Sequence, residues 1–150
     1  METATMGRVV VPIKIENLED TYRARKGEIA ESEIRTVEVA DALVDTGAST
    51  LLLPATLIRQ LGLFAIKTQP LRTAGGPGTM TTYSAVRLTL QGRDCTLDVG
   101  EIGDGLPVLV GQIPLELLDW IVDPKRQRLI GNPDHGGQHM IDALGALDPN

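Results

Sequence analysis

The nine residues Ala42-Leu43-Val44-Asp45-Thr46-Gly47-Ala48-Ser49-Thr50 carry the strongest structural signal in this chain. The segment Thr36 to Val44 first alternates polar and apolar residues and then becomes fully apolar, which predicts a strand that enters a buried core. An ionised carboxylate at the end of such a strand is costly unless it is neutralised or held by partners. Asp45 is therefore a candidate acid/base group that is fixed, desolvated and poised for proton transfer.

The residues that follow Asp45 suit that role. Gly47 permits a tight turn and the close approach of another segment. The hydroxyl groups of Thr46 and Ser49 are expected to hold the carboxylate through local hydrogen bonds. Asp-Thr-Gly by itself is also compatible with an ordinary turn that contains a capping aspartate, so its interpretation depends on the motifs around it.

Two further motifs follow downstream. A glycine-rich hairpin tip, Ala74-Gly75-Gly76-Pro77-Gly78, begins about thirty residues after the aspartate. Val108-Leu109-Val110-Gly111 ends another apolar strand and leads into a short helix at Pro114 to Leu118. A buried strand that ends in glycine can pack closely against a neighbouring loop.

The remaining segments predict an all-β, barrel-like domain with one or two short helices over residues 1–131. Arg8 to Ile15 is an expected strand, and Pro12 favours a position at a sheet edge. Asn17 to Arg35 is rich in charge and is interpreted as a long solvated loop or a loosely paired hairpin. A last hairpin is expected at residues 120–130, followed by a weakly ordered tail over residues 132–150.

Composition excludes several classes of function. The chain has 150 residues, a net charge of -6 and 3% aromatic residues, which argues against a nucleic-acid partner. Its single cysteine, Cys95, excludes an intrachain disulfide and is expected in the core. No segment has the pattern of a membrane span or an export signal, so a cytoplasmic protein without a membrane partner is expected.

In order and spacing, Leu43–Ser49, Ala74–Gly78 and Val108–Gly111 resemble the motifs of the retropepsin-like aspartic proteases. This family of single-domain proteins includes the retroviral proteases and bacterial relatives. The resemblance implies an acid-protease barrel in which Asp45 is catalytic and Thr46, Gly47, Ala48 and Ser49 support it. It also implies that Ala74, Gly75, Gly76, Pro77 and Gly78 form a flap over the substrate. Leu109, Val110 and Gly111 would pack behind the catalytic loop.

The family's chemistry uses two carboxylates that share a proton and activate water, so it needs no metal and no other cofactor. This sequence contains one Asp-Thr-Gly, which implies a homodimer with one Asp45 from each protomer. The substrate would be an extended polypeptide bound as an added strand. The resemblance further implies that Thr46 bonds across the interface and that Val9–Val11 and Arg128–Ile130 build a sheet between subunits.

Several features of the sequence allow another interpretation or depart from the family pattern. A dimerisation or peptide-binding module without proteolysis is the alternative function. His135 and His139 could be metal ligands, although Gly136-Gly137 between them makes a helix that would align them unfavourable. Gln112 stands where retroviral members have an arginine that braces the dimer. The apolar pocket linings expected from the pattern are Leu71, Met80, Val108 and Leu109.

Overall fold

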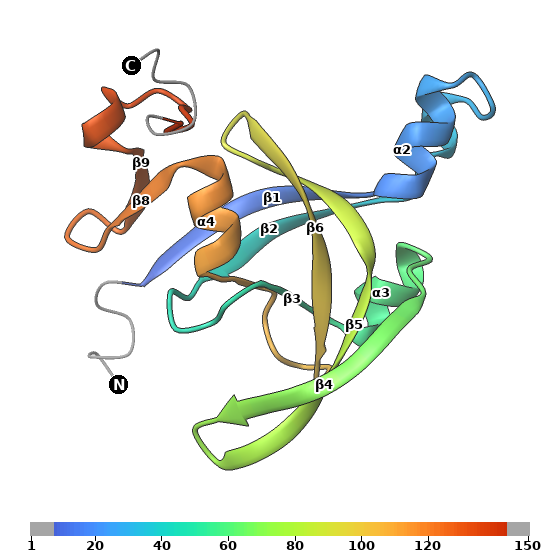
Figure 1. Ribbon diagram of the computed structural model, residues 1–150, viewed down its shortest axis with the longest axis horizontal. Helices are drawn as coiled ribbons and strands as arrows, with labels where there is room; N and C mark the ends of the chain where they lie inside the picture. Colours follow the sequence, from blue (N-terminus) through green and yellow to red (C-terminus); the bar gives the residue numbers. More distant parts are fainter. Residues whose placement is uncertain (1–7, 144–150) are drawn as a thin grey trace.

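Strands dominate the chain because β-branched and apolar residues alternate with polar ones along much of its length. The computed structural model describes residues 8–143 (Figure 1). Within them the strands are β1 (Val9–Asn17), β2 (Thr36–Val44), β3 (Leu51–Pro54), β4 (Ala65–Thr73), β5 (Gly76–Leu90), β6 (Arg93–Ile102), β7 (Leu109–Val110), β8 (Trp120–Asp123) and β9 (Arg128–Gly131). The expected all-β architecture is confirmed.

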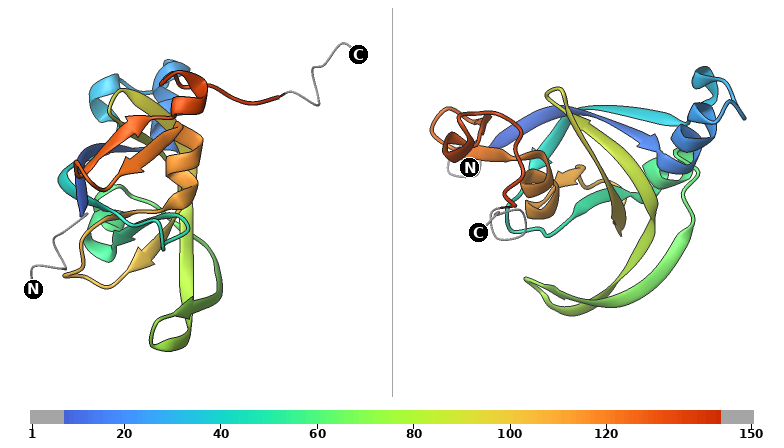
Figure 2. Two further views of the ribbon diagram at one scale, coloured as in Figure 1. Left: turned by 90° about the vertical axis from the view of Figure 1, so that its left-hand side faces the viewer. Right: turned by 45° about the horizontal axis from the view of Figure 1, so that its top comes forward.

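Six of these strands close into a barrel. The order is β1-β2-β7-β3-β6-β5, and the ring is closed because β1 also pairs with β5. The β2–β7 and β3–β6 pairs are parallel, and the other pairs of the ring are antiparallel. Outside the ring, β4 pairs with the first half of β5 as a protruding hairpin, and β8 pairs with β9 (Figures 1 and 2).

Pro12 lies in the first half of β1, which pairs with β2 alone, so this stretch has the edge position expected from the sequence. Only the second half of β1 has β2 on one side and β5 on the other. Pro12 also lies at a register shift between Val11 and Ile13 in the β1–β2 ladder. A proline is tolerated there because the irregular position requires no ladder hydrogen bond from its nitrogen.

The core fills the barrel with aliphatic side chains. Its largest fully buried members come from most of the strands and from the helices, and include Ile15, Leu51, Leu53, Leu61, Leu88, Leu90, Leu115 and Leu118. Alternation along β1, β3 and the second half of β5 sends every second residue into this core, which fixes the register of these strands, whereas every residue of β4 is exposed. Cys95 packs partly buried against the same cluster.

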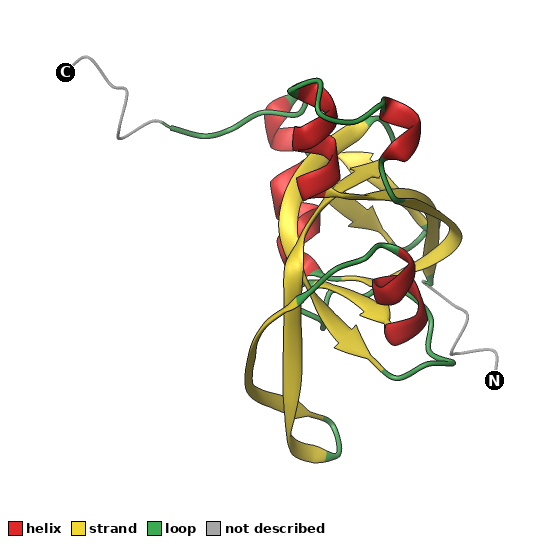
Figure 3. Cartoon of the chain, turned by 90° about the vertical axis from the view of Figure 1, so that its right-hand side faces the viewer, coloured by secondary structure: helices red, strands yellow, loops and turns green. Residues whose placement is uncertain are grey.

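The described residues contain three α-helices, one or two more than the sequence predicted: α2 (Leu18–Arg25), α3 (Ala55–Gln60) and α4 (Gln112–Leu118) (Figure 3). Two short 3₁₀ turns, Glu31–Glu33 and Pro133–His135, complete the helical structure. The segments of α3 and α4 were expected to be helical. By contrast, α2 replaces the loop or hairpin predicted over Asn17 to Arg35.

Capping and long-range polar contacts explain why α2 forms. The Asn17 side chain caps the helix by accepting from the Asp20 amide at 3.0 Å, and it donates to the Leu61 carbonyl at 2.8 Å. Buried Asp20 accepts three bonds from Arg35, at 2.8 to 3.0 Å. The Arg35 guanidinium in turn lies against Gly62, where a Cβ would collide with it. The helix has no apolar stripe from which it could have been predicted.

The chain after β9 also differs from the expected weakly ordered tail. Residues 132–142 return to the end of α4, where Asp119 contacts Asn132, His135 and Met140. Arg93 of β6 donates to the Gly137 carbonyl at 2.6 Å. This segment is held by polar contacts with residues that are distant in sequence. Its apolar pattern is weak, so the sequence alone does not predict that it docks. Residues 144–150 lie outside the described part of the chain.

The Asp20–Arg35 contact should contribute measurably to stability. We expect Asp20→Asn to lower the free energy of unfolding by about 1–3 kcal/mol, because the buried acceptor loses its charge. The Arg35 hydrogen bonds lower the pKa of Asp20 below 3.8, so this contribution is present above that pH and disappears as pH falls. Urea unfolding at several pH values measures both effects. Glu19→Gln, an exposed change on the same helix, is the control, and an equal effect of the two variants would contradict the prediction.

Candidate active site

Asp45 directly follows β2, and a turn holds its position. Its amide donates to the Val110 carbonyl at 2.9 Å, and its carbonyl accepts from the Ala48 amide at 3.0 Å. The carboxylate oxygen Oδ1 accepts from the Gly47 amide at 2.9 Å. The sequence predicted that the hydroxyls of Thr46 and Ser49 would hold this carboxylate. In the structure the carboxylate is held instead by the backbone amide of Gly47, two residues later, which is the usual contact of an aspartate side chain in a tight turn.

The catalytic loop candidate is only partly shielded in the single chain. Asp45 and Ala48 are half-buried, whereas Thr46, Gly47 and Ser49 are exposed. Full desolvation of the carboxylate, expected from the apolar strand, is therefore not achieved by one chain. The exposed side of the loop is free to be covered by another molecule.

β7 and the first turn of α4 brace the loop from behind. The Gly111 amide donates to the Thr50 carbonyl at 3.0 Å, and the amides of Gln112 and Ile113 donate to the carbonyls of Ala48 and Ser49 at 2.9 Å each. A Cβ on Gly111 would lie 2.5 and 2.6 Å from the carbonyl oxygens of Thr50 and Ala48. Only glycine permits this approach, so the structure brings the second sequence motif into direct contact with the Asp45 loop.

Three leucines from three strands lie side by side next to the loop. Leu43 pairs with Leu109, and Leu109 pairs with Leu52. All three are half-buried, whereas their strand neighbours Leu51 and Val110 point into the core. Asp45 follows Leu43 by two residues while its amide still bonds to β7, so its side chain emerges on the face of these leucines. We call Leu43, Leu109 and Leu52 the leucine strip.

The β4–β5 hairpin reaches this face from the side. Residues 74 and 75 form its two-residue turn, in which the Thr73 hydroxyl donates to the Gly76 carbonyl at 2.6 Å. Farther down the hairpin, half-buried Met80 fills the space above Gly100 together with Leu52, because a Cβ on Gly100 would meet both side chains. The hairpin base therefore contacts the leucine strip, while the tip, residues 74–78, extends beyond the barrel (Figure 1).

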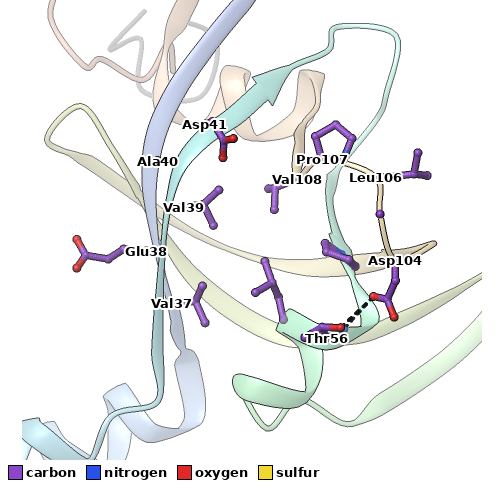
Figure 4. Close-up of a pocket in the computed structure, with 13 residues that line it drawn as sticks. Val37, Glu38, Val39, Ala40, Asp41, Thr56, Asp104, Leu106, Pro107 and Val108 are labelled. Atoms are coloured by element: carbon purple, nitrogen blue, oxygen red, sulfur yellow. Dashed lines mark hydrogen bonds between the residues drawn. The ribbon is translucent and has the colours of Figure 1, made fainter.

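The expected pocket linings occupy different places. Leu109 belongs to the leucine strip and Met80 shares the space above Gly100 with Leu52, whereas Leu71 lies on the exposed hairpin opposite Gly78. Val108 differs from the expectation: it points toward a separate open groove of about 450 Å³ behind the strip (Figure 4). Successive strand residues face opposite sides, so neighbouring positions 108 and 109 cannot line one pocket.

Figure 4 shows that Val37, Val39 and Val108 converge on that groove. At one end of it, Asp104 accepts from both the amide and the hydroxyl of Thr56, each at 3.2 Å. Asp45 is not among the residues that line this groove. The groove is therefore distinct from the face that carries the candidate catalytic loop.

The two histidines make separate contacts. His135 lies between Asp119 and Asp142, and the His139 ring contacts the Leu117 carbonyl at 2.9 Å. Over residues 8–143 no group of three or more histidine, cysteine or acidic side chains is placed to hold a metal ion. Burial, and secondarily Asp94, raises the pKa of the Cys95 thiol to about 11, so the thiol stays protonated at neutral pH.

Gln112 stands at the position of the arginine that braces the dimer in retroviral members, and its side chain makes a contact within α4. Its side chain donates to Glu116 Oε1 at 3.0 Å, one turn along α4. The loop after Asp45 is held by backbone amides at the start of α4. Among the described helices, none is long and apolar enough to cross a membrane.

The tight approach of Gly111 gives a direct test of how the loop is held. We expect Gly111→Ala to lower the free energy of unfolding by about 1–3 kcal/mol, because its Cβ would overlap backbone oxygens that cannot move independently. Gly103→Ala is the matched control, because the nearest heavy atom to its Cβ would be Leu106 Cδ1 at 4.0 Å. Urea denaturation compares the variants, and equal stability would show that the loop tolerates a side chain at position 111.

Much of this chain matches a known protein family. A family model described as aspartyl protease matches residues 27–113, more than half of the chain, and its range includes the Asp45 loop, the hairpin tip and Gly111. Among solved structures, the EIAV protease complexed with the inhibitor HBY-793 is similar, with 15% identity, a TM-score of 0.46, and coverage of 89% of this chain and 93% of that chain. No curated protein matches the chain in sequence. The family match confirms the resemblance seen in the three motifs, and the chain belongs to the aspartyl protease family.

Proposed function

We propose that this chain is an aspartic endopeptidase that acts as a homodimer, with the Asp45 carboxylates of two protomers forming one catalytic pair. The observation that carries the proposal is the placement of Asp45. Its backbone is fixed by β7 and its carboxylate by the Gly47 amide, yet it opens on an apolar face that one chain leaves uncovered.

A pair of carboxylates is needed because the reaction requires a base and an acid together. The ionised carboxylate takes a proton from water, which attacks the peptide carbonyl, while the protonated carboxylate donates to the carbonyl oxygen. The tetrahedral intermediate then breaks its C–N bond as the amine leaves with a proton. No second Asp-Thr-Gly or Asp-Ser-Gly occurs in the sequence, so a second copy is the simplest source of the partner carboxylate.

The surface around Asp45 suits an extended polypeptide. The leucine strip offers an apolar floor, and Met80 extends it toward the β4–β5 hairpin. In this proposal the tip, Ala74–Gly78, closes over the bound peptide. The substrate backbone would then pair with main-chain groups, and its apolar side chains would lie on the strip.

Exposed elements beside the loop are available for the second protomer. The Thr46 side chain is exposed, in keeping with a bond across the interface. Val10 is 45% exposed, and residues 9–11 of β1 pair with β2 alone. Arg128–Ile130 lies in β9, which pairs with β8 in a separate two-stranded sheet and is the second segment that we propose for the interface.

Proteolysis should depend on the Asp45 carboxylate. We expect Asp45→Asn to reduce the cleavage of a denatured protein substrate by about 10²–10⁴-fold, because the amide cannot exchange the proton. Asp41→Asn removes the same charge from an exposed position on β2, the strand that precedes Asp45, and should retain activity. Cleavage is followed by fluorescence release from labelled, unfolded substrate, with mass spectrometry of the products.

Two results would argue against the endopeptidase. Equal activity of the wild type and Asp45→Asn would exclude the carboxylate mechanism. Binding of extended peptides by both proteins, without cleavage by either, would favour the alternative of a non-proteolytic dimerisation or peptide-binding module.

Activity should also depend on association. We expect light scattering to give a mass near twice 16.1 kDa at high concentration, and specific activity to fall on dilution as dimers dissociate. Mixing excess inactive Asp45→Asn protein with the wild type should suppress activity by forming mixed dimers. Full activity in a preparation that remains monomeric would contradict the shared catalytic pair.

A further inference from the structure

Asp119, at the junction of α4 and β8, lies at the centre of a buried polar cluster. It adopts a left-handed conformation with φ of 60° and is 8% exposed. Its Oδ1 accepts from the Asn132 side chain at 3.1 Å, and its Oδ2 accepts from the Met140 amide at 3.1 Å. The His135 ring contacts the same Oδ2 through Nδ1 at 2.6 Å. Three residues of the returning segment 132–142 therefore converge on one carboxylate.

His135 connects this buried carboxylate to a second one. Its Nε2 lies 3.0 Å from Oδ2 of Asp142, whose side chain is 68% exposed. When both carboxylates are ionised they can only accept, so both ring nitrogens must carry a proton. A neutral imidazole has a single N–H donor and would leave one nitrogen lone pair facing a carboxylate oxygen. The observed geometry is therefore that of a protonated histidine.

The same segment covers the carbonyl end of α4. The Leu117 carbonyl accepts from His139, and the carbonyls of Leu118 and Asp119 accept from Arg93 at 3.0 and 2.8 Å. Arg93 also binds the Gly137 carbonyl and lies 3.8 Å over the Trp120 ring. Cationic donors at the end of a helix satisfy its free carbonyls and complement its dipole.

We infer that residues 132–142 form a pH-dependent clamp on α4, in which protonated His135 is the latch. α4 is short, and its other end donates the Gln112 and Ile113 amides to the catalytic loop candidate. The clamp thus holds the helix that positions residues 48 and 49. The catalytic consequence rests on the proposed endopeptidase function, whereas the clamp itself does not.

The surrounding charges set the direction of the pH response. Asp119 first and Asp142 second raise the pKa of His135 above 6.5, while Arg93 is the cation that contacts the other side of the cluster. His135 first, then Asn132 and the Met140 amide, lower the pKa of Asp119 to about 2. Docking is therefore strongest from about pH 4 to 6.5. It weakens as pH rises through the raised pKa of His135 and as it falls toward 2.

Nuclear magnetic resonance of the full chain tests the latch without any substrate. The chain has two histidines, so His139→Gln assigns the ring signals by difference. We expect His135 to titrate above pH 6.5. The Met140 amide, corrected for intrinsic exchange, should lose protection over the same pH range. Its docking equilibrium should change about tenfold for each unit by which the pKa of His135 is raised.

Asp142→Asn separates the latch from simple packing. This exposed change should lower the pKa of His135 and move the loss of Met140 protection to lower pH by the same amount. Asp134→Asn, an equal charge change next to the histidine but outside its hydrogen bonds, should have a smaller effect. An ordinary or lowered pKa of His135, or protection of Met140 that ignores its titration, would overturn the inference.

Proteolysis provides the second arm of the experiment. If the clamp positions the loop, Asp142→Asn should move the alkaline limb of the pH–rate profile by the shift measured for His135. An unchanged limb, with the magnetic resonance results as expected, would reject only the link to the catalytic loop. If the wild type cleaves nothing, the endopeptidase proposal fails, while the spectroscopic result still decides whether the clamp exists.

Discussion

The close backbone contact between Gly111 and the loop after Asp45 is the constraint on which the rest of the structure depends. It allows Gly111 and the first turn of α4 to supply amides to three consecutive carbonyls, at Ala48, Ser49 and Thr50. These bonds need no side chain, so they define the loop by shape and leave the Asp45 carboxylate free for chemistry. A loop with its own polar side chains turned inward could not present this carboxylate as openly.

The loop is connected through α4 to the C-terminal part of the described chain. One end of α4 contacts the loop, Asp119 follows the other end, and the segment after β9 binds Asp119. Gly131 assists because a Cβ there would collide with the Gly137 backbone, so strand and returning segment can pack directly. The C-terminal part of the described chain thus supports the same element that supports the Asp45 loop.

Buried carboxylates join strands of the barrel to each other and α2 to the chain that follows it. Glu16 of β1 is 7% exposed and binds Arg87 of β5 at 2.9 Å. Asp20 of α2 binds Arg35, which precedes β2, at 2.8 Å. Such pairs contribute less to stability than apolar packing would, because desolvation opposes their attraction. Their value here is positional, since each carboxylate accepts only a donor that arrives in the right place. Buried carboxylates can therefore position α2 and the segment 132–142 without a larger apolar core.

The sequence by itself determined the barrel class, the Asp45 loop and the hairpin, because strand alternation and glycine-rich turns are local patterns. It also indicated the aspartyl protease family, because the three motifs occur in the same order as in that family. Tertiary structure decided what local patterns do not encode: α2 depends on Arg35, fifteen residues away from Asp20. The leucine strip depends on register between strands, and the C-terminal clamp depends on Asp119 meeting His135. Each of these arises where residues distant in sequence meet, and only the folded barrel brings them together.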